Sequence, residues 1–402
     1  MSPDVQVEKP QLKTPVSLIV DDSSPGEPIY SDFVDAFAVL VQETRIKGKF
    51  TVMPYTSPET LSDALKGKRP LAIERLIKKI RQHIAPNFDI TPEILTHNPV
   101  ADLETGGFVY PCVPEHVWSQ SQTAQTLTPY IARALRILRD AGMEAWGVTS
   151  PANFGIDVET EYAEAVLRAQ QQINHRSLTW YFLHTDVATS RILPKLAFVD
   201  MARREAVVSI VSGYGDYVVR PELRERPMEE KVSGYADQYL TTDGRQGRLA
   251  DLYRADSYLI FHHHWWRMLW DDGAGFKILR EVVRRLDEIF GQGIQWMKIG
   301  EIALYWAAAQ WLEVEVKETK VGMGLKFRSP FQCPNFTVSF EMAVDPRRLL
   351  IRRQSQEFAR QESVELSGPH VWCMKDGRVY LCFDLDFETE IEVRIIGHNP
   401  GD

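Results

Sequence analysis

The sequence lacks an apolar run of about 20 residues, so it predicts no membrane-spanning helix. It also lacks an excess of basic residues: 46 Lys and Arg stand against 55 Asp and Glu, and the formal net charge is -9. This charge argues against a nucleic-acid-binding surface, which would be basic. The first 15 residues, MSPDVQVEKPQLKTP, lack the apolar core of a secretory signal, and we therefore expect a cytoplasmic protein.

Cysteine is scarce as well, with four in 402 residues and no C-x-x-C pair. Four cysteines allow two disulfides, but a cytoplasmic chain keeps its thiols reduced. We therefore expect the cysteines to be small buried side chains.

Short apolar runs alternate with helical patterns over the first 310 or so residues. Predicted strands include 16–20, 49–53, 178–186, 206–213 and 257–264, and predicted helices lie at 31–48, 73–84, 128–142, 157–173 and 278–289. Repeated strand–helix units indicate a parallel sheet, and seven or eight of them indicate a closed β/α barrel. We expect this α/β barrel at residues 15–311, after an N-terminal arm at 1–14.

The pattern changes near Leu312, where strands of period two follow one another with turns between them. This pattern predicts an antiparallel β-sandwich at 312–402, and we expect it to hold no catalytic residue. Residues 214–256 are polar and rich in Arg and Gly. They predict a long insertion near the barrel mouth that borders the active site, because long loops there are often functional.

Polar side chains gather where the predicted strands end. The apolar run Val16–Val20 stops at two adjacent acids, Asp21 and Asp22, whose charges repel each other unless a cation or solvent compensates them. Other predicted strands end at His97, Asn153, His184, Asp186, and His262, His263 and His264. Carboxylates and imidazoles suit zinc or a similar divalent ion. The alternatives are a turn or helix cap for the acidic pair and a solvated patch for the histidines.

The order of these features resembles the polysaccharide deacetylase superfamily, carbohydrate esterase family 4. The resemblance rests on LIVDD at 18–22, THNPVAD at 96–102, YLIFHHH at 258–264 and IQWMKIGEIA at 294–303, and covers about residues 15–309. It implies a distorted (β/α)7-type barrel, a divalent metal cofactor, taken as zinc, and hydrolysis of acyl groups from a carbohydrate.

The resemblance also implies roles for individual residues. Asp21 would be the catalytic base, and Asp22 and His97 would bind the metal. His262 or His264 would be the general acid, since both lie on the same side of an extended strand. The family's second metal histidine is replaced here by Ala101, so Asp102 or His184 would complete the metal site. The family's arginine-proline motif is reduced to Ser150 and Pro151, without arginine.

The sequence therefore predicts a metal-dependent hydrolase that acts on a glycan or a related amide. Its candidate substrate-binding residues are Asn153, Asp186, Trp265 and Trp266. The first alternative is a glycoside hydrolase in which Asp22 works with Glu104, Asp186 or Glu301. The second is a barrel that binds carbohydrate without catalysis, which the missing second histidine favours. The sequence does not indicate an oligomeric state.

Overall fold

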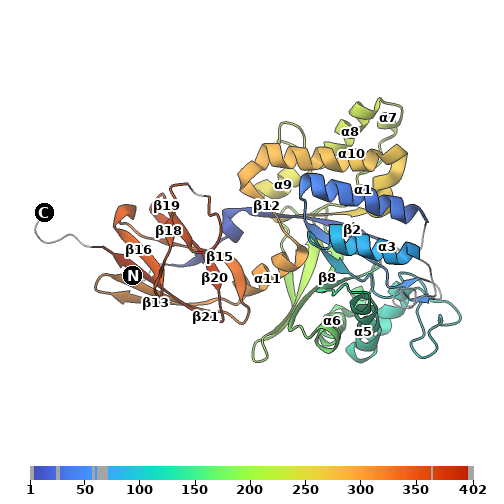
Figure 1. Cartoon of the computed structure of the whole chain (residues 1–402), viewed down its shortest axis with the longest axis horizontal. Coiled ribbons are helices and arrows are strands. Elements are labelled where there is room, and N and C mark those ends of the chain that lie inside the picture. The colour runs from blue at the N-terminus through green and yellow to red at the C-terminus, as the bar shows by residue number, and fades with distance from the viewer. Residues whose placement is uncertain (1–3, 24–27, 57–58, 61–70, 364, 397–402) are drawn as a thin grey trace, which may run out of the picture. The chain divides into compact units, whose positions relative to one another are not determined.

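The computed structural model describes residues 4–23, 28–56, 59–60, 71–363 and 365–396. The chain divides into two compact units (Figure 1). One consists of Pro15–Ala303 and the other of Met1–Thr14 together with Leu304–Asp402. Among the described residues, no helix combines the length and apolar character that crossing a bilayer requires. The mixed α/β class expected from the sequence is confirmed.

The larger unit contains two sheets of mainly parallel strands. The first has the order β11-β2-β3-β6, with β12 added beside β2. The second has the order β7-β8-β10-β9, in which β9 is an antiparallel edge strand. These strands span Thr14–Asp21 (β2), Gly48–Thr51 (β3), Phe88–Thr91 (β6), Gly147–Thr149 (β7), Leu178–Thr185 (β8), Lys195–Asp200 (β9), Glu205–Ser212 (β10), Leu259–His264 (β11) and Ile294–Trp296 (β12).

Two isolated parallel bridges link these sheets. Glu93, just after β6, pairs with Thr149 of β7, and Tyr214, just after β10, pairs with Phe261 of β11. Each bridge involves a residue just beyond the carboxyl end of a strand, β6 or β10. In the first sheet the strands β11, β2, β3 and β6 run parallel, so the carboxyl ends of β2, β6 and β11 lie at one edge, where residues distant in sequence meet.

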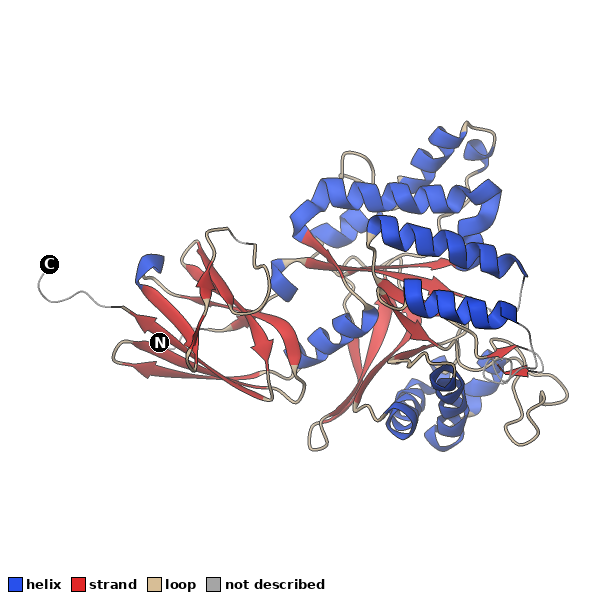
Figure 2. Cartoon of the chain, in the orientation of Figure 1, coloured by secondary structure: helices blue, strands red, loops and turns tan. Residues whose placement is uncertain are grey.

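Helices cover the strands (Figure 2). In Figure 1, α1 and α10 lie on one side of β2, and α5 and α6 lie on the other. Aromatic side chains of α1 explain its position: Phe33 and Phe37 are fully buried and contact Phe50 and Phe88 of the sheet at ring-centroid distances of 6.1 and 5.2 Å. The helices span Pro28–Thr44 (α1), Leu71–Lys79 (α3), Glu115–Trp118 (α4), Ala124–Asp140 (α5), Glu159–Asn174 (α6), Trp265–Phe290 (α10) and Ile299–Gln310 (α11).

The polar segment 214–256 is largely helical. It contains α7 (Pro221–Arg224), α8 (Met228–Ala236) and α9 (Arg248–Arg254). Arg285 of α10 is 1% exposed and binds both the carboxylate of Asp237 and the backbone oxygen of Leu240, each at 2.7 Å. The segment is thus packed onto α10, which its polar composition did not indicate.

The smaller unit consists of two five-stranded sheets, β1-β15-β20-β19-β18 and β13-β14-β21-β16-β17. The N-terminal arm belongs to this unit, because β1 (Gln6–Val7) pairs with β15. The other strands are Glu313–Thr319 (β13), Gly322–Arg328 (β14), Cys333–Glu341 (β15), Leu349–Arg353 (β16), Gln356–Glu357 (β17), Ala359–Arg360 (β18), Val371–Lys375 (β19), Arg378–Leu385 (β20) and Glu388–Ile395 (β21). The unit begins at Leu304, eight residues before the boundary expected from the sequence.

Candidate metal centre

Asp22 stands directly after β2 in a left-handed backbone conformation, with φ of 62°. This conformation is unfavourable for a residue with a side chain, and such strain is concentrated at functional sites. The N–H of Asp22 donates to Oε2 of Glu93 at 3.1 Å. The turn after β2 is thus held by a carboxylate that follows β6.

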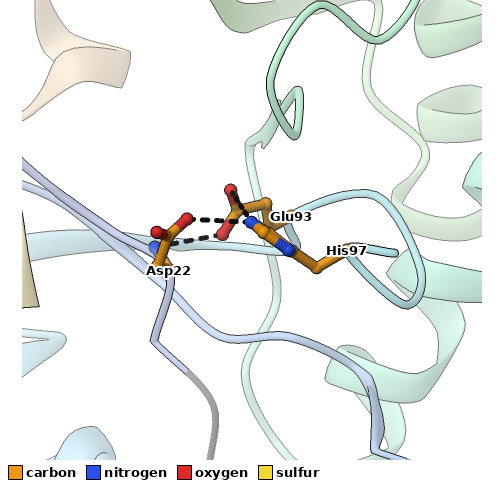
Figure 3. A group of neighbouring side chains, drawn as sticks. All are labelled: Asp22, Glu93 and His97. Carbon is orange, nitrogen blue, oxygen red and sulfur yellow. Dashed lines mark hydrogen bonds and ion pairs between the residues drawn. The ribbon is translucent and has the colours of Figure 1, made fainter. Parts of the chain in front are cut away.

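Three side chains converge here: Asp22, Glu93 and His97 (Figure 3). Nε2 of His97 lies 2.9 Å from Oδ1 of Asp22 and 3.4 Å from Oε1 of Glu93. One ligand atom from each residue lies within 4.8 Å of the others. With ligand bonds of about 2.1 Å, neighbouring ligand atoms are about 3.0 Å apart in an octahedron and about 3.4 Å apart in a tetrahedron. The donor set and its spacing therefore fit a divalent cation.

The electrostatics of the group are those of two acids around one imidazole. Burial opposes ionisation of Asp22, but the hydrogen bond with His97 and the charges of His264 and His97 lower its pKa to about 2. Burial also opposes protonation of His97, yet Asp22 and Glu93 raise its pKa to about 11. Glu93 is 2% exposed, and burial together with the charge of Asp21 raises its pKa to about 7. The proton of His97 thus neutralises carboxylate charge, and a divalent cation held by the same three side chains would take over this role.

Glu93 was not singled out from the sequence, and Asp102 and His184 were proposed in its place. Neither is in the converging group. Oδ1 of Asp102 accepts the N–H groups of Glu104 and Thr105 in its own turn, and Nε2 of His184 lies 2.8 Å from Oε1 of Glu159. The available signal was the spacing of Glu93 and His97, two metal-binding residue types four positions apart after a strand.

Asp21 is neutralised separately from Asp22. Its Oδ1 accepts a hydrogen bond from the ammonium group of Lys49, which is fully buried on β3. Lys49 also donates to the hydroxyls of Thr51 at 2.7 Å and Thr149 at 2.6 Å. The two adjacent acids therefore have different partners: a lysine for Asp21, and histidines for Asp22. The signal that sequence reasoning overlooked was a lysine inside a predicted strand, next to Phe50.

The three histidines of β11 have three different environments. His264 places Nδ1 2.5 Å from Oδ2 of Asp216 and Nε2 3.6 Å from Oδ2 of Asp22. Burial opposes its protonation, but the hydrogen bond and charge of Asp216 raise its pKa to about 9. Nδ1 of His262 lies 3.1 Å from the hydroxyl of Ser212, and burial lowers the pKa of His262 to about 4. His263 is 1% exposed, on the other side of the strand.

No family model matches the chain, and no curated protein matches it. Among solved structures, it is similar to a Mycobacterium smegmatis protein assigned as a polysaccharide deacetylase, with 13% identity, a TM-score of 0.44, and coverage of 75% of this chain and 93% of that one.

Two other solved structures are similar, with lower sequence identities and TM-scores. A carbohydrate esterase family 4 pseudoenzyme from Bacillus anthracis has 7% identity and a TM-score of 0.34, with coverage of 74% of this chain and 68% of that one. A glycoside hydrolase family 30 subfamily 8 xylanase from Clostridium acetobutylicum has 9% identity and a TM-score of 0.31, with coverage of 98% and 99%. Identities and TM-scores this low leave function to be argued from the residues of the site.

The candidate substrate-binding residues are dispersed. Trp265 is only 7% exposed and packs on Tyr30 and Phe33, so it belongs to the core and presents no free ring to a ligand. Trp266 is 43% exposed and stacks on His264, with ring centroids 5.6 Å apart. Asn153 is exposed, and Oδ1 of Asp186 accepts the N–H groups of Ala188 and Thr189 in a turn; neither is in the converging group.

The contrast between the adjacent tryptophans predicts different effects on stability. Trp265→Ala is expected to lower the free energy of unfolding by about 3–5 kcal/mol, because it leaves a cavity in the core. Trp266→Ala is expected to change it by less than about 1 kcal/mol, because much of this ring already faces water. Urea unfolding monitored by circular dichroism measures both values, and equal losses would contradict the assignment of Trp265 to the core.

Proposed function

We propose that the Pro15–Ala303 unit is a metal-dependent hydrolase that removes acyl groups from a glycan or a related amide. The observation that carries the proposal is the convergence of Asp22, Glu93 and His97 into one cation-sized group at the strand ends. A second acid, Asp21, lies next to this group in sequence but is held by a different partner. Two acids with separate environments suit two different roles.

In this proposal Asp22, Glu93 and His97 hold the cation, and an Asp, Glu and His set suits zinc or a similar ion. When bound, the cation supplies positive charge that polarises an acyl oxygen and lowers the pKa of water toward about 7. Asp21 accepts the proton of the attacking water as the general base. Lys49 and Thr51 fix its orientation, since both donate to Oδ1 of Asp21.

His264 suits the general acid better than His262 does. Its Nδ1 is bonded to Asp216, and the raised pKa keeps its imidazole protonated near neutral pH. Burial lowers the pKa of His262 to about 4, so it is neutral under the same conditions and lacks the acidic imidazolium proton of a general acid. His264 would therefore donate the proton that the leaving amine or alcohol takes up.

The carbohydrate substrate is part of the proposal. Trp266 contacts the ring of His264 and the guanidinium of Arg267, and the exposed part of its ring offers apolar surface against which a sugar ring can pack. The glycosidase alternative has less support, because Oδ1 of Asp186, one of the acids suggested as partners for Asp22, accepts the N–H groups of Ala188 and Thr189 in its own turn. Another of these acids, Glu301, accepts the N–H of Lys298 at 2.9 Å.

We also propose that the parallel strands close into a barrel and that the smaller unit is a β-sandwich. The two bridges between the parallel sheets support the first statement. The second is supported by Phe327 of β14 and Phe383 of β20, which lie on different sheets with ring centroids 4.9 Å apart. The cytoplasmic location expected from the sequence remains a prediction.

The decisive experiment compares metal content with acyl release. The wild-type protein is expected to contain about one divalent ion per chain after loading with Zn²⁺, and to release acetate from an N-acetylated chito-oligosaccharide. Treatment with a chelator should abolish this release, and Zn²⁺ should restore it. Elemental analysis and an acetate assay make the measurements.

Asp102→Ala is the matched control, because it removes an acid from the loop after His97 that lies outside the converging group. It should retain both the metal and the activity. A wild-type protein that binds no divalent cation, or whose acetate release survives the chelator, would contradict the proposal. If the Asp102→Ala protein bound no metal, Asp102 would be a metal ligand, as the sequence predicted.

A further inference from the structure

Glu115 is a buried carboxylate that contacts the backbone of His97. It begins the short helix α4 and has no exposed surface. Its Oε1 accepts the N–H of Thr96 at 2.9 Å, and its Oε2 accepts the N–H of His97 at 2.8 Å. The hydroxyl of Tyr130 donates to Oε1 at 2.6 Å. Two consecutive backbone N–H groups thus enclose one carboxylate, an arrangement typical of anion-binding turns.

The same loop is fastened at a second point. The N–H of Glu115 donates to the backbone oxygen of Asn98 at 2.6 Å, so residue 115 binds the loop through its backbone and its side chain. The hydroxyl of Thr96 donates to the backbone oxygen of Pro99 at 2.5 Å. These bonds hold residues 96–99 in a closed turn.

His97 occupies an unfavourable backbone conformation in this turn, with φ of 70°. A residue with a side chain avoids this region unless its surroundings impose it. The bonds from Glu115 supply such a constraint, because they hold the N–H of His97 itself. The direction of the imidazole depends on this conformation, since φ orients the Cα–Cβ bond relative to the preceding peptide.

We propose that Glu115 is a positioning residue that holds the imidazole of His97 toward Asp22 and Glu93 and thereby sets the affinity of this group for a divalent cation. The inference rests on the proposed function, because it takes these three residues as the metal ligands. Without the carboxylate, the N–H groups of Thr96 and His97 lose their acceptor, and the turn relaxes toward conformations that supply another. The imidazole then leaves the two carboxylates. Residues that orient metal ligands in this way commonly change metal affinity by about 10–100-fold.

Glu115→Gln tests the inference with little change in shape. The amide has one acceptor oxygen and an NH₂ group, so it can accept only one of the two N–H groups and opposes the other with a donor. We expect the dissociation constant for Zn²⁺ to rise about 10–100-fold, measured by calorimetric titration against a competing chelator. Faster hydrogen exchange at the amides of residues 96 and 97 should accompany the loss.

Tyr130→Phe is the matched control. It removes a hydroxyl that donates to the same carboxylate and accepts the N–H of Ala101, but it leaves both side-chain bonds and the backbone bond between Glu115 and the His97 turn. It should lower thermal stability while the dissociation constant for Zn²⁺ stays within about threefold of the wild-type value, well short of the change from losing an orienting residue. If Glu115→Gln does not fold, Glu115→Asp replaces it, because the shorter acid keeps its charge but draws back from the turn. A weakened affinity is again expected.

Two results would overturn this inference but not the proposed function. In the first, Glu115→Gln, or Glu115→Asp in its place, binds Zn²⁺ as tightly as the wild type. In the second, Tyr130→Phe weakens Zn²⁺ binding as much as the change at Glu115 does. The second result would mean that general loosening of the loop explains the effect. A wild-type protein that binds no Zn²⁺ would overturn the proposed function, and the inference with it. These outcomes are distinguishable because the wild type is titrated in the same series.

Discussion

Replacing Asp22 with alanine is expected to strip the divalent cation from the protein and to abolish acyl hydrolysis. Burial opposes ionisation of Asp22, but the hydrogen bond with His97 lowers its pKa to about 2, whereas the pKa values of Glu93 and His97 are raised, so the carboxylate of Asp22 is charged at every pH at which the enzyme would work. Its Oδ1 lies 2.9 Å from Nε2 of His97, in the spacing of neighbouring metal ligands. Elemental analysis after Zn²⁺ loading and an acetate-release assay measure the two losses.

Asp21→Asn is the matched comparison for Asp22→Ala. It removes the charge of the adjacent acid without touching the three converging ligands. The folded protein should keep its metal but lose turnover by about 10²–10⁴-fold, the usual contribution of a general base. It should also be less stable than the wild type, because Lys49 then stays buried without its counter-charge. If Asp22→Ala retained a full complement of metal, Asp22 would not be a ligand. If Asp21→Asn kept normal turnover, another group would have to act as the base.

Replacing Lys49 with methionine is expected to lower the free energy of unfolding by about 3–5 kcal/mol, the usual cost of removing one partner of a buried ion pair. Lys49 has no exposed surface, and Asp21 is only 4% exposed. The substitution leaves the carboxylate of Asp21 without its cation, and also removes a donor from the hydroxyls of Thr51 and Thr149. Equilibrium unfolding in urea measures the change.

Two further proteins separate the loss of the ion pair from other effects. Lys49→Met combined with Asp21→Asn should recover part of the stability, because no uncompensated charge then remains buried, while activity stays absent. Lys47→Met removes a neighbouring lysine whose side chain is 36% exposed and lies 3.8 Å from Glu301, so stability should change by less than about 0.5 kcal/mol. Wild-type stability in Lys49→Met would contradict the role of this pair.

The mixed α/β class was predictable because it is encoded in local periodicity. Apolar runs such as Val16–Val20 and helical patterns such as Phe33 to Val41 report which face of each element is buried. The helices of residues 214–256 were missed because this polar segment does not show such a local apolar pattern. They are short, and they are stabilised by packing on α10 through Arg285, which no local pattern in the segment records.

Part of the candidate site could also be predicted from the sequence, since polar residues at the carboxyl ends of parallel strands share one edge of a sheet. Asp21 and His264 illustrate this: they end neighbouring strands and are paired in register. Asp22 and His97 meet although 75 positions separate them. Their roles as metal ligands remain predictions that the proposed substitutions test.

By itself, the sequence determined the alternation of strands and helices and the placement of acids and histidines at strand ends, because both depend on residues close together in the chain. Only the tertiary structure decided which partner each acid has. Glu93 joins the group in place of Asp102 because the backbone beyond β6 turns it toward Asp22, whereas Asp102 closes a turn of its own. Lys49 meets Asp21 because β2 and β3 are neighbours in the sheet. Strand order and loop path bring these charges together, and neither can be read from the spacing of residues along the chain.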